Sequence, residues 1–177
     1  MGNIIRLNDD QPVEEWLSMS NGGTDALLDI LGLAGTALAK TEREKQMIIW
    51  LVEKDSTYLG MGTIGFDIVK MPWTKAGFES ERTFMLRVID EAAKGLGWEK
   101  LDYVPNEELM MPRLERLRSF FEQMTVDMVD EENLREWIEI DKEYPEYYAI
   151  PDGYPVCEKH GMLKSYFGCR RCFEPKG

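Results

Sequence analysis

The spacing of hydrophobic residues predicts helices over most of the chain. Residues 24–40 are apolar around most of the circumference of a helix, which is typical of a helix at the centre of a core. We predict that Thr24 caps this helix. Thr41 and Glu44 then form the Thr-x-x-Glu pattern of a capping box, which predicts a second helix through residues 47–52. This continuous apolar run also fits a buried strand.

Helical spacing of apolar residues returns in the second half of the chain. Residues 80–94 and 131–143 each place large apolar side chains on one face. Asn106 can cap a turn between these segments, and Pro112 is predicted to start another helix, where a proline costs no hydrogen bond. A short helix is also predicted near the N-terminus, over residues 10–17.

Two segments interrupt the helical pattern. Between residues 56 and 73, glycines separate the apolar residues, which predicts short β structure or a packed loop. Three of these glycines match the Gly-x-Gly-x-x-Gly spacing of dinucleotide-binding loops, but Pro72 leaves little room for the helix that such a loop requires. We therefore interpret them as a glycine-punctuated turn or strand. Residues 98–104 are predicted as one short strand.

The composition changes after residue 143. Residues 144–156 contain three prolines and four tyrosines, which predicts an extended linker. The chain is therefore divided into an acidic helical body at residues 1–143, a Pro- and Tyr-rich linker at 144–156, and a metal-binding finger at 157–177. The predicted fold class is mainly α, with a small β element in the body and a zinc-finger or ribbon-like tail.

All the cysteines and the only histidine of the chain lie in this tail. Cys157 and His160 form a Cys-x-x-His pair, Cys169 and Cys172 form a Cys-x-x-Cys pair, and eight residues separate the two pairs. A two-residue gap places both ligands of a pair on one tight turn. Three thiolates and one imidazole complete the tetrahedron that Zn²⁺ adopts in structural sites. The spacing predicts one structural zinc ion, with another metal or unrelated free thiols as the alternatives.

This segment resembles the short zinc-ribbon and treble-clef fingers that read CxxHG…GCxxC. The resemblance implies a structural metal held by Cys157, His160, Cys169 and Cys172. It leaves function open, because such fingers bind either nucleic acid or protein. A complete ligand shell has no open position for a reactive water, and a ligated histidine cannot activate a serine or cysteine nucleophile. Catalysis by zinc or by such a nucleophile is therefore not expected.

The charge is divided unevenly along the chain. The chain has 33 acidic and 21 basic residues, a formal charge of −12. Residues 157–177 contain five basic and two acidic residues, a formal +3, so the remainder carries −15. A body this acidic repels phosphate backbones, which excludes a general nucleic-acid coat. The basic finger could touch nucleic acid, contact a protein or dock on its own acidic body.

Nine acidic residues lie between residues 127 and 146, against only two basic ones. We predict that this stretch is a docking face for a basic protein partner; the alternative is a solvated helix face. The predicted contact residues are Asp130, Glu131, Glu132, Glu136, Trp137, Tyr147 and Tyr148.

The predicted location is the cytoplasm. The N-terminus lacks the apolar run of a secretory signal, no apolar stretch is long enough to cross a bilayer, and three cysteines do not form an even disulfide set. The function that we expect is a non-catalytic, zinc-binding protein-interaction module. Its size and acidity suggest, by analogy, an inhibitor or immunity-type protein that blocks a basic partner. The alternatives are a nucleic-acid-associated regulator that uses the finger, and an enzyme with carboxylate chemistry.

Overall fold

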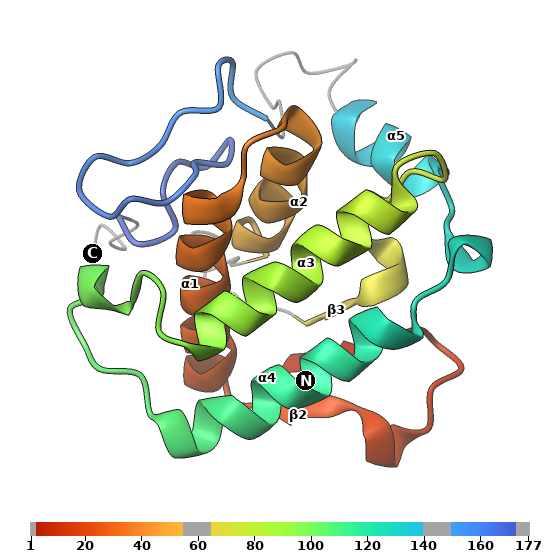
Figure 1. The fold of residues 1–177 in the computed structure, drawn as a ribbon, viewed down its shortest axis with the longest axis horizontal. Helices are drawn as coiled ribbons and strands as arrows, with labels where there is room; N and C mark the ends of the chain where they lie inside the picture. The colour runs from red at the N-terminus through yellow and green to blue at the C-terminus, as the bar shows by residue number, and fades with distance from the viewer. Residues whose placement is uncertain (1–2, 55–64, 140–149, 173–177) are drawn as a thin grey trace.

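The computed structural model describes residues 3–54, 65–139 and 150–172, which form a mainly helical fold with one small sheet (Figure 1). The predicted fold class is confirmed. The helices of these described residues are α1 (Asn21–Leu38), α2 (Glu42–Val52), α3 (Phe78–Ala93), α4 (Glu107–Gln123) and α5 (Glu132–Glu139). The strands are β1 (Asn3–Arg6), β2 (Leu17–Met19) and β3 (Phe66–Asp67).

Helix α1 is the centre of the core, as its apolar pattern predicts. It packs against α2 and α3, and α3 packs in turn against α4. Its N-terminal cap is Ser20 rather than the predicted Thr24: Ser20 Oγ accepts a hydrogen bond from Gly23 N at 3.1 Å, while the Thr24 hydroxyl donates to Ser20 O. The helix therefore begins one turn earlier than predicted. None of the described helices combines the length and the apolar character needed to span a bilayer.

The predicted capping box opens α2. Glu44 N donates to Thr41 Oγ1 at 3.1 Å, and Thr41 N donates to Glu44 Oε1 at 3.0 Å. The apolar run at residues 47–52 that also fitted a strand is helical and fully buried. The cap decides between the two structures because it satisfies backbone N–H groups that only a helix leaves unpaired.

The sheet has the strand order β2-β1-β3, with β2 antiparallel and β3 parallel to β1. The prediction of a short helix over residues 10–17 is wrong. Only Val13–Glu15 form a 3-10 turn, and β2 begins at Leu17. Gly65 lies against β1 so closely that a Cβ there would overlap Ile4 O. The rest of the predicted Gly-x-Gly-x-x-Gly segment lies outside the described residues.

The strand predicted over residues 98–104 is also wrong. Trp98–Lys100 form a 3-10 turn, preceded by Gly95 and Gly97 with φ of 90° and 86°. A Cβ on Gly97 would lie 2.8 Å from Leu33 Cβ, so the close approach to α1 sets this turn. Asn106, predicted to cap a turn, caps α4 itself: its Oδ1 accepts a hydrogen bond from Leu109 N at 3.2 Å. Pro112 lies inside α4 and does not start it.

The C-terminal segment, blue in Figure 1, packs beside α1 and α2. Leu163 N donates to Thr36 Oγ1 of α1 at 3.0 Å, and Gln46 Nε2 of α2 donates to the Tyr154 hydroxyl at 3.1 Å. Met162 and Leu163 are buried in the same core cluster as the helices of the body. The division into body, linker and finger stays a prediction, and residues 144–149 of the predicted linker lie outside the described part of the chain.

Candidate metal centre

The first ligand pair lies on a tight turn. Cys157 N donates to Met162 O at 2.9 Å, and Gly161 N donates to Cys157 O at 2.7 Å. Gly161 has a φ of 65°, a conformation that glycine adopts without steric cost. This reversal brings the side chains of Cys157 and His160 together, which explains why a two-residue gap precedes a glycine here.

The second ligand pair follows a short hairpin. Ser165 and Gly168 exchange backbone hydrogen bonds of 3.1 and 2.9 Å, and Gly168 has a φ of 87°. The chain then turns again, with Cys172 N donating to Cys169 O at 3.1 Å. This second turn returns two cysteine side chains to the first ligand pair.

The four predicted ligands converge on one point. Nδ1 of His160 lies 3.7 Å from Cys157 Sγ, 3.7 Å from Cys169 Sγ and 3.3 Å from Cys172 Sγ. The sulfurs of Cys157 and Cys172 are 3.5 Å apart, and all four ligand atoms lie within 4.8 Å of one another. A tetrahedral zinc ion with Zn–S bonds of about 2.3 Å keeps such atoms about 3.5–3.8 Å apart. The cluster therefore has the dimensions of a metal site.

The three thiols are free and compete for negative charge. Burial opposes ionisation of Cys157, but hydrogen bonds from the His160 backbone and the neighbouring thiols outweigh it and lower its pKa to about 6. Burial raises the pKa values of Cys169 and Cys172, and the charge on Cys157 adds to the rise. A divalent cation removes this conflict because it stabilises all the thiolates at once.

A buried carboxylate of α1, which the sequence reasoning did not assign to the site, lies beside the second ligand turn. Asp29 is 0% exposed. Its Oδ1 accepts from Arg170 Nε at 2.8 Å, and its Oδ2 accepts from Arg171 Nη1 at 3.1 Å and from the Tyr103 hydroxyl at 2.6 Å. The signal in the sequence was an acidic residue within the longest apolar stretch of the chain, because a buried charge requires partners.

The two arginines between Cys169 and Cys172 are turned toward the body. The side chain of Arg170 is 2% exposed and also pairs with Asp25. Arg171 Nη2 donates to Asp102 at 2.6 Å. Burial and the charge of Asp29 raise the pKa of Tyr103, which keeps its hydroxyl protonated as a donor to that carboxylate. Two of the five basic residues of the finger are therefore paired with the chain's own acids.

The predicted partner residues divide into three groups. Asp130, Glu131 and Glu136 are exposed, and Glu132 is half-buried and pairs with Arg135. Trp137 is 8% exposed, so it is not an exposed anchor as the docking hypothesis required. Tyr147 and Tyr148 lie outside the described residues.

Trp137 is buried because it attaches α5 to α2. Its Nε1 donates to Glu53 Oε1 at 2.6 Å. Burial raises the pKa of Glu53 to about 7, against the lowering effects of Lys54 and of this hydrogen bond. The apolar side of the amphipathic helix α5 therefore buries its tryptophan, and its acidic residues lie on the side that faces solvent.

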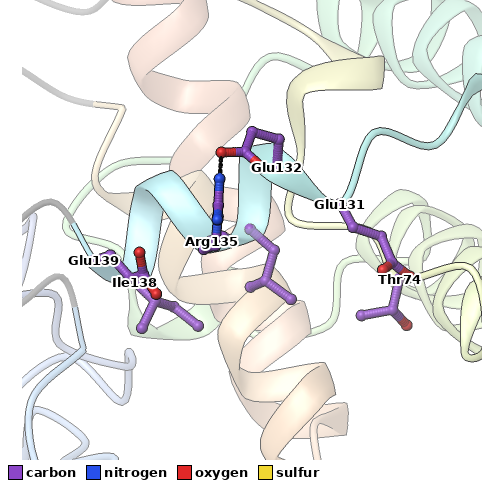
Figure 2. Close-up of a pocket in the computed structure, with 7 residues that line it drawn as sticks. Thr74, Glu131, Glu132, Arg135, Ile138 and Glu139 are labelled. Atoms are coloured by element: carbon purple, nitrogen blue, oxygen red, sulfur yellow. Dashed lines mark ion pairs between the residues drawn. The ribbon is translucent and has the colours of Figure 1, made fainter.

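An open pocket of about 470 Å³ lies along α5, and seven of its lining residues are drawn in Figure 2. Leu134 and Ile138 supply apolar surface, and Ile138 is 42% exposed. Glu131 and Thr74 lie together at one end of the view, Glu139 lies beside Ile138 at the other, and Arg135 pairs with Glu132 between them.

Comparison of the chain with known protein families, with curated proteins and with solved structures finds no match.

Proposed function

We propose that Cys157, His160, Cys169 and Cys172 bind one Zn²⁺ as a structural ion. The support is the close spacing of the three sulfurs and His160 Nδ1, which all lie within 4.8 Å of one another, together with the preference of zinc for thiolate and imidazole ligands. The four protein ligands fill the coordination shell, so the ion has no position for a catalytic water. The residues of this centre bind and orient the metal and close the finger; they move no proton of a substrate.

Purified protein should contain about one zinc ion per chain by elemental analysis. Substitution with Co²⁺ should give the absorption bands of a tetrahedral site with three sulfur ligands, because the ligand field reports the donor set. Protein that takes up no metal after reduction of its thiols, or that forms a Cys169–Cys172 disulfide in its native state, would contradict this proposal.

We further propose that the protein is a non-catalytic interaction module whose acidic α5 face binds a basic protein. The observation that carries this proposal is the α5 pocket, which combines apolar lining with carboxylates. A lysine or arginine of a partner could lay its aliphatic stem on Leu134 and Ile138 and place its cation near Glu131 or Glu139. The net charge of −12 would speed the encounter with such a partner.

The alternatives have less support. Arg170 and Arg171, the arginines of the finger, are engaged by Asp25, Asp29 and Asp102 and are not presented to a phosphate backbone. The buried carboxylates Asp29 and Glu81 are also engaged: Glu81 accepts from Thr74 at 2.6 and 2.8 Å and pairs with Arg43. These contacts give both carboxylates a structural role, which favours a binding protein over a carboxylate enzyme. Blocking of a basic target, as small acidic antagonists of bacterial toxins do, is the specific activity that we propose.

Charge reversal on the outer face of α5 should weaken partner binding at least tenfold, about 1.4 kcal/mol. The variant replaces Glu132, Glu136 and Glu139 with lysine. Asp130 and Glu131 are kept, because they accept backbone hydrogen bonds from Glu132 N and Lys75 N and so hold α5 in place. The partner is first identified by affinity purification from the native host with mass spectrometry, and binding is then measured by titration calorimetry at low and high salt.

A matched control reverses the same number of exposed acids away from α5. Glu14, Glu99 and Glu115 are exposed and lie on separate elements, so their replacement by lysine changes the net charge equally. We expect the control to lose only the long-range part of the attraction. Equal losses in both variants would show that net charge alone, and not the α5 face, determines binding. Loss of binding only when Arg170 and Arg171 are replaced would move the function to the finger.

A further inference from the structure

We infer that Asp29 is a positioning residue of the metal centre: through Arg170 and Arg171 it holds the turn that carries two of the four ligands, so metal affinity and the packing of α1 are coupled. This inference rests on the zinc site proposed above. It assigns a role to a residue 141 positions away from the turn along the chain. With this coupling, the zinc ion would stabilise the packing of the body as well as the fold of the tail.

The contacts connect the metal ligands to α1 by a very short route. Arg170 and Arg171 are the only two residues between Cys169 and Cys172. Both side chains reach the same carboxylate, one at each oxygen, with N–O distances of 2.8 and 3.1 Å. Two arginines anchored on one rigid helix restrict the backbone between the cysteines. The sulfurs at its two ends are thereby held where the metal requires them.

The burial of Asp29 makes this attachment mutual. A buried carboxylate that loses its counterions is strongly destabilising, by far more than a surface ion pair contributes. If the finger left α1, Asp29 would remain inside the core with only the Tyr103 hydroxyl among the partners described here. The body therefore favours the docked finger, and the docked finger presents a preformed turn to the metal. Thermodynamic linkage then requires reciprocity: the factor by which docking of the finger on α1 raises the metal affinity is also the factor by which metal binding favours that docking.

The finger also contacts α1 at positions outside the Asp29 network. Leu163 N donates to Thr36 on α1, and the Met162 side chain lies against Gly32, where a Cβ would come within 3.1 Å of its sulfur. The finger thus meets α1 through an apolar contact on one side and the Asp29 network on the other. A displacement of the finger from α1 would disturb both.

The test is the zinc affinity of Asp29→Asn in the full chain, measured by competition with a chromophoric chelator. Asparagine keeps the shape of the side chain but cannot neutralise two arginines, so we expect about tenfold weaker binding, the usual effect of changing a group that orients metal ligands. The Co²⁺ spectrum should keep its three-sulfur signature. The matched control is Asp102→Asn, which removes the same charge from Arg171 at a site 81% exposed; we expect less than a twofold change.

A second measurement separates positioning from simple destabilisation. If Asp29→Asn only weakens the core, the melting temperatures with and without zinc fall equally, and the shift that zinc produces stays as in the wild type. Coupling instead predicts a smaller zinc-induced shift. If this variant does not fold, Tyr103→Phe removes only the hydroxyl that donates to Asp29, and we expect about threefold weaker zinc binding.

The outcomes are distinguishable. A wild-type protein that binds no zinc would refute the proposed metal site itself. Wild-type zinc binding together with an unchanged affinity and an unchanged zinc-induced shift in Asp29→Asn, or in Tyr103→Phe where that variant is needed, would overturn the coupling and leave the metal site standing. An equal loss of affinity in Asp102→Asn would show a general charge effect and would also overturn it.

Discussion

Replacing Cys169 with serine should lower the melting temperature of the whole protein, including its helices. The substitution removes one of four metal ligands, and zinc binding to such a set contributes folding free energy directly. The finger shares its core with the body, because Met162, Leu163 and Cys169 are buried in the same cluster as α1. We expect a loss of at least about 4 kcal/mol, which for a chain of this size is a fall of about 10 °C. Far-ultraviolet circular dichroism during heating measures this.

The control for this prediction is metal removal from the unchanged protein. A strong chelator should lower the wild-type melting temperature to nearly that of Cys169→Ser, and it should have little further effect on the variant. If the variant instead showed an unchanged helical transition, with only an early loss of the finger, the finger would be an independent module. The boundary predicted at residues 144–156 would then divide two separately folding units.

Replacing Arg170 with methionine should have the second large effect. The side chain is 2% exposed, and the change leaves the fully buried Asp29 with half of its counterions. Breaking a buried pair by removing one partner costs about 3–5 kcal/mol, because the remaining charge stays in a medium of low polarity. Urea unfolding at saturating zinc should report a loss of this size in the free energy of unfolding.

Arg171→Met provides the matched comparison. Its side chain is 19% exposed and shares its charge between Asp29 and the exposed Asp102. Arg171→Met also removes a counterion from Asp29, but the Arg171 guanidinium is partly solvated, so we expect a smaller loss than that of Arg170→Met. Equal effects of the two substitutions would contradict the view that burial of the Arg170–Asp29 pair sets its energetic importance. The double variant Arg170→Met with Asp29→Leu should regain much of the lost stability, because neither charge of the buried pair remains.

The helices and the ligand set were predictable because their signals are local. A capping box such as that of Thr41 and Glu44 satisfies backbone groups within one turn, and the apolar period of α1 reports burial on all sides. The Cys-x-x-His and Cys-x-x-Cys pairs encode two tight turns with a glycine beside each. Tetrahedral coordination then leaves few other ways to use three cysteines and one histidine.

Two of the errors fall where long-range contacts decide local structure. Residues 17–19 form a strand because they pair with β1, and the sequence of so short a segment does not predict which strand it pairs with. Trp98 lies in a turn because Gly97 must pass close to Leu33 of α1. The tyrosines at 147 and 148 lie outside the described residues, so their role in binding remains a prediction.

The amino-acid sequence alone determines the mainly helical class, the four candidate ligands and the opposite charges of body and tail. Each of these depends on spacing or composition, which can be read without the fold. Only the tertiary structure decides where the charges go. The fold brings Arg170 and Arg171 onto Asp29. It also buries Trp137 against Glu53, so this tryptophan is not part of the acidic face. Ion pairs between residues so distant along the chain have no local signal, since the cost of burying a charge is offset only when folding brings its partner within hydrogen-bonding distance.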